Sequence, residues 1–126
     1  MPTPITVRID TMELVGQLND SLSAQALAAL LPLTIRMDRW GDEYYGALEK
    51  PLGVAEAADA REDMAVGELA YWSPGNSLCL FFGPTPASTG EQPRAVSPVN
   101  PEGVVYGDVK ALKGLGRIVE VTLASQ

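Results

Sequence analysis

The sequence predicts a mainly β protein, a closed antiparallel eight-stranded barrel with one or two short capping helices. Three observations support this fold class. Short segments with apolar residues at every second position recur along the chain, glycine and proline residues separate them, and only one segment has the composition of a helix. The 126 residues suffice for one hydrophobic core and contain no internal repeat, so we expect a single domain over residues 1–126.

The first part of the chain contains two predicted strands and the helix. Apolar and polar residues alternate over residues 5–9, which is the period of a half-buried strand, and residues 12–18 form a second apolar segment. Cap-forming residues at 19–23 precede the sequence AQALAALL at residues 24–31. This segment predicts a short helix over the open end of the barrel, and Pro32 ends it.

Most of the remaining chain is predicted to be β-structure. Residues 49–65 lack periodicity and carry a patch of acidic side chains, which is typical of an exposed loop. Residues 84–103 are rich in proline and predict a second loop. The other segments are predicted strands, at residues 33–40, 43–48, 66–72, 77–83, 104–109 and 117–124.

The composition excludes several classes of function. A formal net charge of -7 opposes binding to nucleic acid or to anionic lipid, so neither partner is expected. The chain has no histidine, which excludes Ser-His-Asp and Cys-His catalysis as well as His-ligated zinc, and no metal or other cofactor is expected. We find no signal-peptide pattern and no apolar run long enough to cross a bilayer, so a cytoplasmic location is expected.

Two short segments contain residues of types that can carry out chemistry. Asp42 and Glu43 are adjacent acids beside Trp40, but neighbours on a strand point to opposite faces, so a polar turn is favoured over a paired acid–base site. Cys79 lies in an apolar strand without a basic neighbour, which favours a small buried residue over a nucleophile. We assign no catalytic residue.

Residues 70–72 and 78–82 are apolar on both faces of their predicted strands. Such a strand needs cover on both sides, from the core on one side and from another element or a partner on the other. Where this cover is incomplete, an apolar groove remains.

Three segments together resemble a known family. They are WGDEYYGAL at residues 40–48, GELAYWSPGNSLCLFFGPTPAS at residues 67–88 and AVSPVN at residues 95–100. The combination is similar to small uncharacterised prokaryotic proteins with a cyclophilin-like fold, and the resemblance extends over nearly the whole chain. It implies a closed eight-stranded barrel capped by helices.

A more distant resemblance is to the cyclophilins, which are peptidyl-prolyl isomerases. Residues 75–77 and 80–82 are similar to a turn and a strand of the cyclophilin proline pocket, and residues 104–109 are similar to the closing segment. On this alignment Phe82 takes the place of an aromatic that lines the pocket. The cyclophilin arginine that stabilises the twisting amide is matched by Gly46, and the pocket histidine and glutamine have no counterpart.

We therefore expect a binding module without isomerase activity, whose aromatic groove takes a peptide or a small apolar ligand. One alternative is a diverged, weak isomerase in which Arg36 or Arg39 replaces the missing arginine. Another is a homodimer that buries the aromatic strands against a second copy. The groove is predicted to be lined by Tyr44, Tyr71, Trp72, Phe82, Arg36 and the loop that contains Thr85 and Pro86.

Overall fold

The computed structural model describes the whole chain, residues 1–126. The chain forms nine strands, one α-helix and two short 3-10 helices. In chain order these elements are β1 (Thr3–Ile9), β2 (Met12–Leu18), α1 (Leu22–Ala28), β3 (Leu33–Trp40), β4 (Glu43–Ala47), β5 (Arg61–Asp63), β6 (Glu68–Trp72), η1 (Ser73–Gly75), β7 (Ser77–Phe81), β8 (Arg94–Tyr106), η2 (Val109–Gly114) and β9 (Ile118–Ser125).

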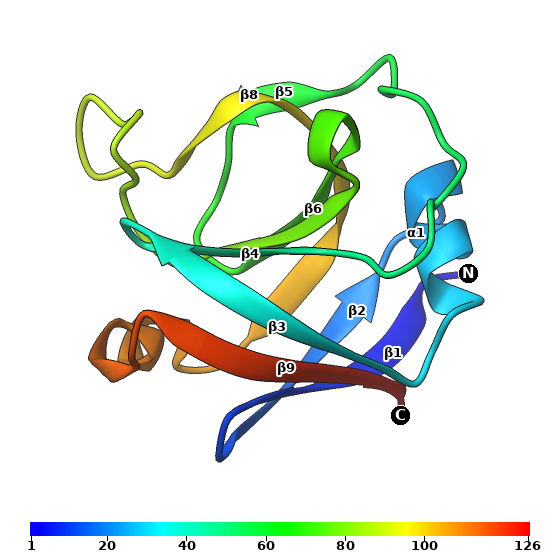
Figure 1. Cartoon of the computed structure of the whole chain (residues 1–126), viewed down its shortest axis with the longest axis horizontal. Coiled ribbons are helices and arrows are strands. Elements are labelled where there is room, and N and C mark those ends of the chain that lie inside the picture. Colours follow the sequence, from blue (N-terminus) through cyan, green and yellow to red (C-terminus); the bar gives the residue numbers. More distant parts are fainter.

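Eight strands close into a ring, in the order β2-β1-β9-β3-β4-β7-β6-β8, and β8 pairs with β2 to complete it (Figure 1). All of these pairs are antiparallel. Where β2 meets β8 the two backbones are so close that a Cβ atom on Gly16 would lie 2.5 Å from the carbonyl oxygen of Val104. The predicted set of eight antiparallel strands in one closed arrangement is confirmed.

Side chains at alternate positions of these strands fill the inside of the ring. Ile5, Val7 and Ile9 of β1 are fully buried, which confirms the half-buried strand predicted from their spacing. The aromatic rings of Tyr44 and Phe82 stack in the same core, with their centroids 5.2 Å apart. Offset aromatic pairs of this kind stabilise a core beyond the area that they bury.

One charged side chain, Arg39 of β3, points into an end of this core. Its guanidinium carbon lies 5.2 Å from the centroid of the Phe82 ring. The guanidinium also donates to the carbonyl oxygens of Lys113 and Leu115, each at 3.0 Å, and pairs with Asp42 at 2.9 Å. Arg39 therefore links η2 to β3 and to the aromatic core. Its charge is paired with Asp42 and bonded to backbone oxygens within the fold.

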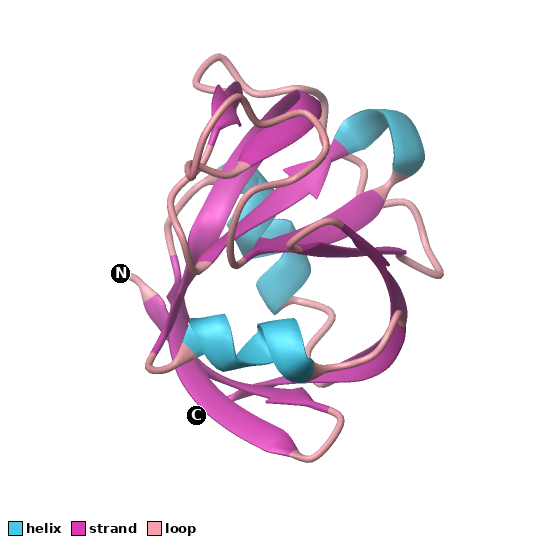
Figure 2. Ribbon diagram, turned by 90° about the vertical axis from the view of Figure 1, so that its left-hand side faces the viewer, coloured by secondary structure: helices cyan, strands magenta, loops and turns pink.

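Helical segments occupy the two ends of the ring, as Figure 2 shows. Ser21 caps the start of α1, and its hydroxyl accepts a hydrogen bond from the Ala24 amide at 3.1 Å. At the other end, Val109 and Leu112 of η2 are buried in the main core. One capping helix was predicted at residues 24–31, and the observed helix starts two residues earlier and ends at Ala28.

Residues 94–103, predicted to be a loop, form the first part of the long strand β8. The prediction is wrong because Pro98 and Pro101 suggested a break in the chain. Pro101 lies next to a bulge in the pairing between β6 and β8, where one residue of the longer strand is unpaired. The first part of β8 also pairs with β5, so residues 61–63 of the expected acidic loop are a short strand.

The rest of that loop is held to the ring by two asparagines. Asn100 of β8 donates to the Ser23 hydroxyl at 2.8 Å and to the Ala55 carbonyl oxygen at 3.0 Å. Its side-chain oxygen accepts from the Ala57 amide at 2.7 Å. Because Asn100 is buried and fully bonded, it fixes the loop against α1 and β8.

Asn76 anchors the start of the same loop from the turn between β6 and β7. Its backbone is left-handed, with φ 48°, a conformation that asparagine tolerates better than most residues. The side-chain oxygen accepts from the Tyr71 hydroxyl at 2.6 Å and from the Leu52 amide at 3.1 Å, and the side-chain nitrogen donates to the Lys50 carbonyl oxygen at 3.0 Å.

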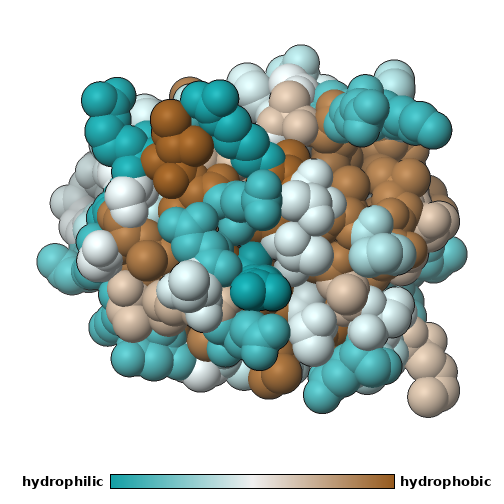
Figure 3. Space-filling view, turned by 60° about the horizontal axis from the view of Figure 1, so that its bottom comes forward, coloured by the Kyte–Doolittle hydropathy of each residue, from teal (hydrophilic) through white to brown (hydrophobic).

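The face at the bottom of Figure 1 carries small apolar patches among hydrophilic side chains (Figure 3). Val15 of β2 and Ile118 of β9 are large apolar residues that are exposed by 45% and 50%. Scattered apolar side chains are common on protein surfaces and indicate no specific partner. None of the helices has the length and apolar character needed to span a membrane.

The Asn76 anchor can be tested by substituting glycine, which adopts the left-handed backbone without strain. Asn76→Gly is expected to lower the free energy of unfolding by about 2 kcal/mol, because the buried Tyr71 hydroxyl loses its acceptor. Urea denaturation measures this change. As a control, Tyr71→Phe should destabilise the wild type more than it destabilises Asn76→Gly, and equal effects in the two backgrounds would contradict the assigned bond.

Candidate functional site

The hairpin formed by β6 and β7 is buried on both faces. All five residues of β7 are buried, and their side chains alternate between two separate apolar clusters. The inner cluster is the core of the ring. The outer cluster covers the opposite face of the hairpin and consists of Met64, Ala70, Cys79, Phe81, Ala95 and Val99, with Trp72 packed against it. The first part of β8 thus covers much of the outer face of these strands, which the sequence predicted to need burial on both faces.

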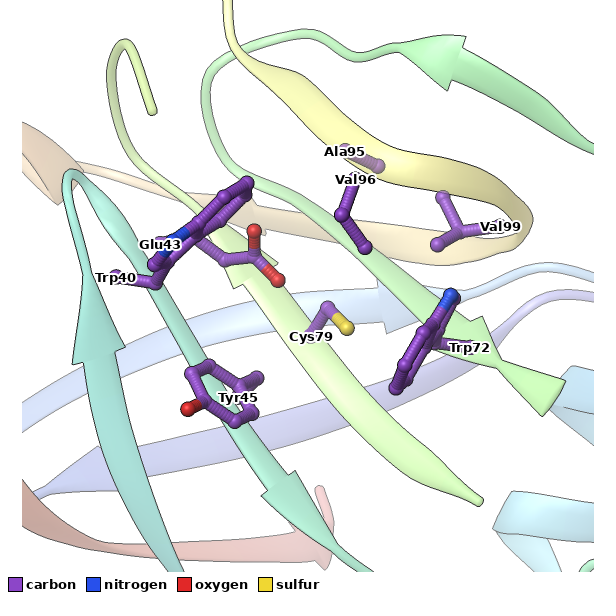
Figure 4. Close-up of a pocket in the computed structure, with 8 residues that line it drawn as sticks. All are labelled: Trp40, Glu43, Tyr45, Trp72, Cys79, Ala95, Val96 and Val99. Atoms are coloured by element: carbon purple, nitrogen blue, oxygen red, sulfur yellow. The ribbon is translucent and has the colours of Figure 1, made fainter. Parts of the chain in front are cut away.

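This cover is incomplete, and a pocket of about 340 Å³ remains on the outer face beside the second cluster (Figure 4). Seven of its eight lining residues are hydrophobic. They come from β3, β4, β6, β7 and β8. The lining residues are Trp40, Glu43, Tyr45, Trp72, Cys79, Ala95, Val96 and Val99.

The walls of the pocket are mainly aromatic. Figure 4 shows Trp40 and Tyr45 on one side and Trp72 on the other. The indole nitrogen of Trp72 donates to the Ser97 hydroxyl at 2.7 Å, which fixes the orientation of that ring. Tyr45 and Val96 are exposed residues and lie where the pocket meets solvent.

Glu43, the first residue of β4, places the only carboxyl group in this pocket (Figure 4). The residue is only 6% exposed, and its Oε1 atom has no hydrogen-bond partner. Burial raises the pKa of Glu43 from 4.5 to about 7, an increase that the neighbouring Cys79 thiol partly offsets. Since no lysine or arginine lines the pocket, the carboxyl is a polar group with unused bonding capacity in an apolar wall.

Cys79 lies next to Glu43 on the paired strand β7, where it is opposite Tyr45 in the register. Burial, together with the nearby carboxyl groups of Glu43 and Glu102, raises the pKa of the Cys79 thiol well above its usual value. A thiolate is therefore disfavoured at neutral pH. This environment is that of a small buried residue, in line with the interpretation from the sequence.

Three of the predicted groove residues lie inside the ring instead. Tyr44, Tyr71 and Phe82 are 0%, 3% and 0% exposed and belong to the main core. The Tyr44 hydroxyl donates to the Gly116 carbonyl oxygen at 2.6 Å, and the Tyr71 hydroxyl donates to Asn76. The assignment to an open groove is corrected, because alternation along β4 and β6 turns these two tyrosines away from the pocket.

The other predicted groove residues are dispersed. The buried Thr85 hydroxyl donates to the Arg94 carbonyl oxygen and has a structural role in its loop. Pro86 is exposed on that loop, and Arg36 is exposed on β3 away from the pocket lining. Of the predicted set, Trp72 is the residue that lines the pocket.

A second buried acid, Glu102, lies at the bulge of β8 and is fully buried without a hydrogen-bond partner for either carboxyl oxygen. Burial raises its pKa well above the usual value. It is not part of the pocket lining. No group of three or more acidic, cysteine or histidine side chains in the chain could hold a metal ion.

Sequence reasoning missed the polar member of the pocket because Glu43 follows a turn. The turn is present at Gly41 and Asp42, but Glu43 is already the first residue of β4 and points to the outer face with Tyr45. An available signal was the apolar strand at residues 78–82, which had to be covered on its second face. What covers it depends on residues 95–99, far away in the sequence.

The buried Glu43 carboxyl predicts a pH-dependent stability. Its pKa is about 7 in the folded protein, whereas the ordinary value of 4.5 applies to the unfolded chain. Between these two pH values the folded protein therefore keeps a proton that the unfolded chain has lost. Its stabilising contribution is fully present below about pH 4.5 and is lost as the pH rises through 7. Relative to Glu43→Gln, the wild type should lose about 3 kcal/mol of unfolding free energy between pH 4 and pH 8.

Urea denaturation of both proteins across this pH range measures the difference. Glu102 titrates in both proteins, so its contribution cancels in the comparison. A difference between wild type and Glu43→Gln that stays constant with pH would contradict a buried, ionisable Glu43.

The family model described as Cyclophilin-like matches residues 3–124. The structure is similar to the solution structure of a hypothetical protein from Archaeoglobus fulgidus, with a TM-score of 0.80, 29% sequence identity and coverage of 99% of this chain and 95% of that chain. No curated protein matches the sequence.

The family match covers nearly the whole chain, and so does the similarity to the archaeal structure. Together they confirm the resemblance noted in the sequence. This chain belongs to the cyclophilin-like family.

Proposed function

We propose that the protein is a binding module for a small apolar ligand that occupies the pocket on the outer face of β4, β7 and β6. The observation that carries the proposal is the pocket itself, with a volume of about 340 Å³ and seven hydrophobic residues among the eight that line it. Sites for small molecules have this size and this mixture of an apolar wall with few polar groups.

The strand pairing favours a small molecule over a peptide. A peptide that binds as an added strand needs an unpaired strand edge. Four of the five strands that line the pocket, β3, β4, β6 and β7, are each paired on both sides and offer no such edge, and the part of β8 that lines the pocket pairs with β5. A compact ligand that contacts side chains alone fits this surface better.

The arginines do not favour the diverged-isomerase alternative. Arg39 is engaged with Asp42 and with backbone oxygens at the end of the ring, and Arg36 is not in the pocket lining. An apolar wall without a donor near the amide supplies little stabilisation that is specific for a twisted transition state.

The proposal can be tested with 2-phenylethanol, a small apolar probe. Both tryptophans of the chain line the pocket, so intrinsic tryptophan fluorescence reports on its occupancy. We expect saturable quenching or a spectral shift in the wild type. Ala95→Leu should weaken this response at least several-fold, because the added side chain fills space inside the pocket.

Ala111→Leu is the matched control, since Ala111 is exposed on η2 and the substitution adds the same volume outside the pocket. It should bind 2-phenylethanol like the wild type. Equal responses from Ala95→Leu and wild type would contradict the proposed site. A fluorescence change that appears on raising the protein concentration without ligand would instead favour the predicted homodimer.

A further inference from the structure

We propose that the ligand of this pocket is a small organic monocation, an ammonium group on an apolar body, whose charge is bound by Glu43 against the aromatic wall. The inference rests on the proposed function, since it requires that the pocket takes a ligand. It goes further by assigning the chemical class of that ligand and the residue that recognises it.

The first argument is that Glu43 lacks a cation within the chain. Its Oε1 atom is buried and unpartnered, and no basic side chain lines the pocket. Several other acids on the surrounding elements are paired with a basic residue. These pairs are Asp42 with Arg39 and Lys113 at 2.9 and 3.3 Å, Glu62 with Arg94 at 2.7 Å, and Glu68 with Arg61 at 2.7 Å. Of the rest, Asp38 of β3 is exposed, and Glu102 of β8 is unpaired but does not line the pocket.

The second argument is the chemistry of the wall around that carboxyl. Figure 4 shows Glu43 between the ring of Trp40 and the aliphatic side chain of Val96, with Trp72 across the pocket. The electron-rich faces of indole and phenol rings attract organic cations, and the interaction strengthens when water is excluded. A carboxylate among aromatic rings therefore matches both the charge and the apolar surface of an alkylammonium ion.

The third argument compares the possible ligands. A buried carboxylate without a partner is unfavourable, and an ammonium group supplies the missing charge together with a charge-assisted hydrogen bond. A neutral alcohol fills the same space but leaves the charge uncompensated. An anion would be repelled by the same carboxylate.

The test compares 2-phenylethylammonium with 2-phenylethanol, which have nearly the same shape, by tryptophan fluorescence at pH 8. The wild type is expected to bind the ammonium roughly ten- to a hundredfold more tightly than the alcohol. Glu43→Gln should abolish this preference and retain binding of the alcohol. Glu13→Gln, an equal change in charge at an exposed position of β2, should leave the preference unchanged.

The outcomes separate the two proposals. If the wild type binds both probes equally, or if Glu43→Gln keeps the preference for the ammonium, the inference is overturned while the binding function stands. If neither probe binds, both proposals are overturned. Glu43→Gln removes a buried charge and is expected to fold. Its denaturation curve shows directly whether a loss of binding is caused by unfolding.

The affinity for the ammonium should also depend on pH. Binding requires the ionised Glu43, so the affinity should rise by about tenfold per pH unit up to its pKa of about 7 and then level off, whereas the alcohol shows no such rise. The other titratable groups that line the pocket are Cys79, whose pKa is raised by burial, and the phenol of Tyr45. The charged groups on adjoining parts of β3–β8 are the ion pairs given above, the exposed Arg36 and Asp38 of β3, and the buried Glu102 of β8, whose pKa is also raised by burial. A flat pH profile for the ammonium would overturn the inference.

Discussion

The fold and the candidate site both depend on the burial of the β6–β7 hairpin on its two faces. The inner face completes the ring core, where Leu78 and Leu80 are buried. The outer face carries Cys79 and Phe81 and would be an exposed apolar surface if the chain ended at the ring. The first part of β8 turns back over this face, and the pocket remains where β8 does not reach. The site is thus a consequence of how the second face is covered.

The way the pocket forms explains why the pKa of its one acid, Glu43, is raised so far. The surroundings of Glu43 are almost entirely apolar, so its Oε1 atom has no hydrogen-bond partner and the Cys79 thiol offsets only part of the effect of burial. The free-energy cost of ionising the buried carboxyl raises its pKa. On the binding proposal, this pocket distinguishes ligands by charge more sharply than by shape, because hydrophobic walls discriminate weakly between similar shapes.

The ring could be predicted from the sequence because its strands have local signals. Alternation in residues 5–9 and the turn at Pro74-Gly75-Asn76 each act over a few residues. The start of β8 and the position of β5 could not be predicted in this way, since prolines at a bulge look like prolines in a loop. The pocket was harder still, because Tyr45 meets Cys79 only through the pairing of β4 with β7. Tyr44 and Phe82 were assigned to a groove on a resemblance, whereas burial places them in the core.

The charged group at the candidate site differs in sign from the one in cyclophilins, which this sequence distantly resembles. In those enzymes an arginine next to an apolar proline pocket stabilises the twisting amide, so the catalytic surface presents a cation to its ligand. Here the arginine of β3 that is nearest the aromatic core, Arg39, is held by Asp42 and by the backbone around η2. The outer pocket presents an unpaired acid instead. On the binding proposal above, the ionised Glu43 favours a cationic ligand, and an ionised acid cannot donate the hydrogen bond that an isomerase supplies to the prolyl nitrogen.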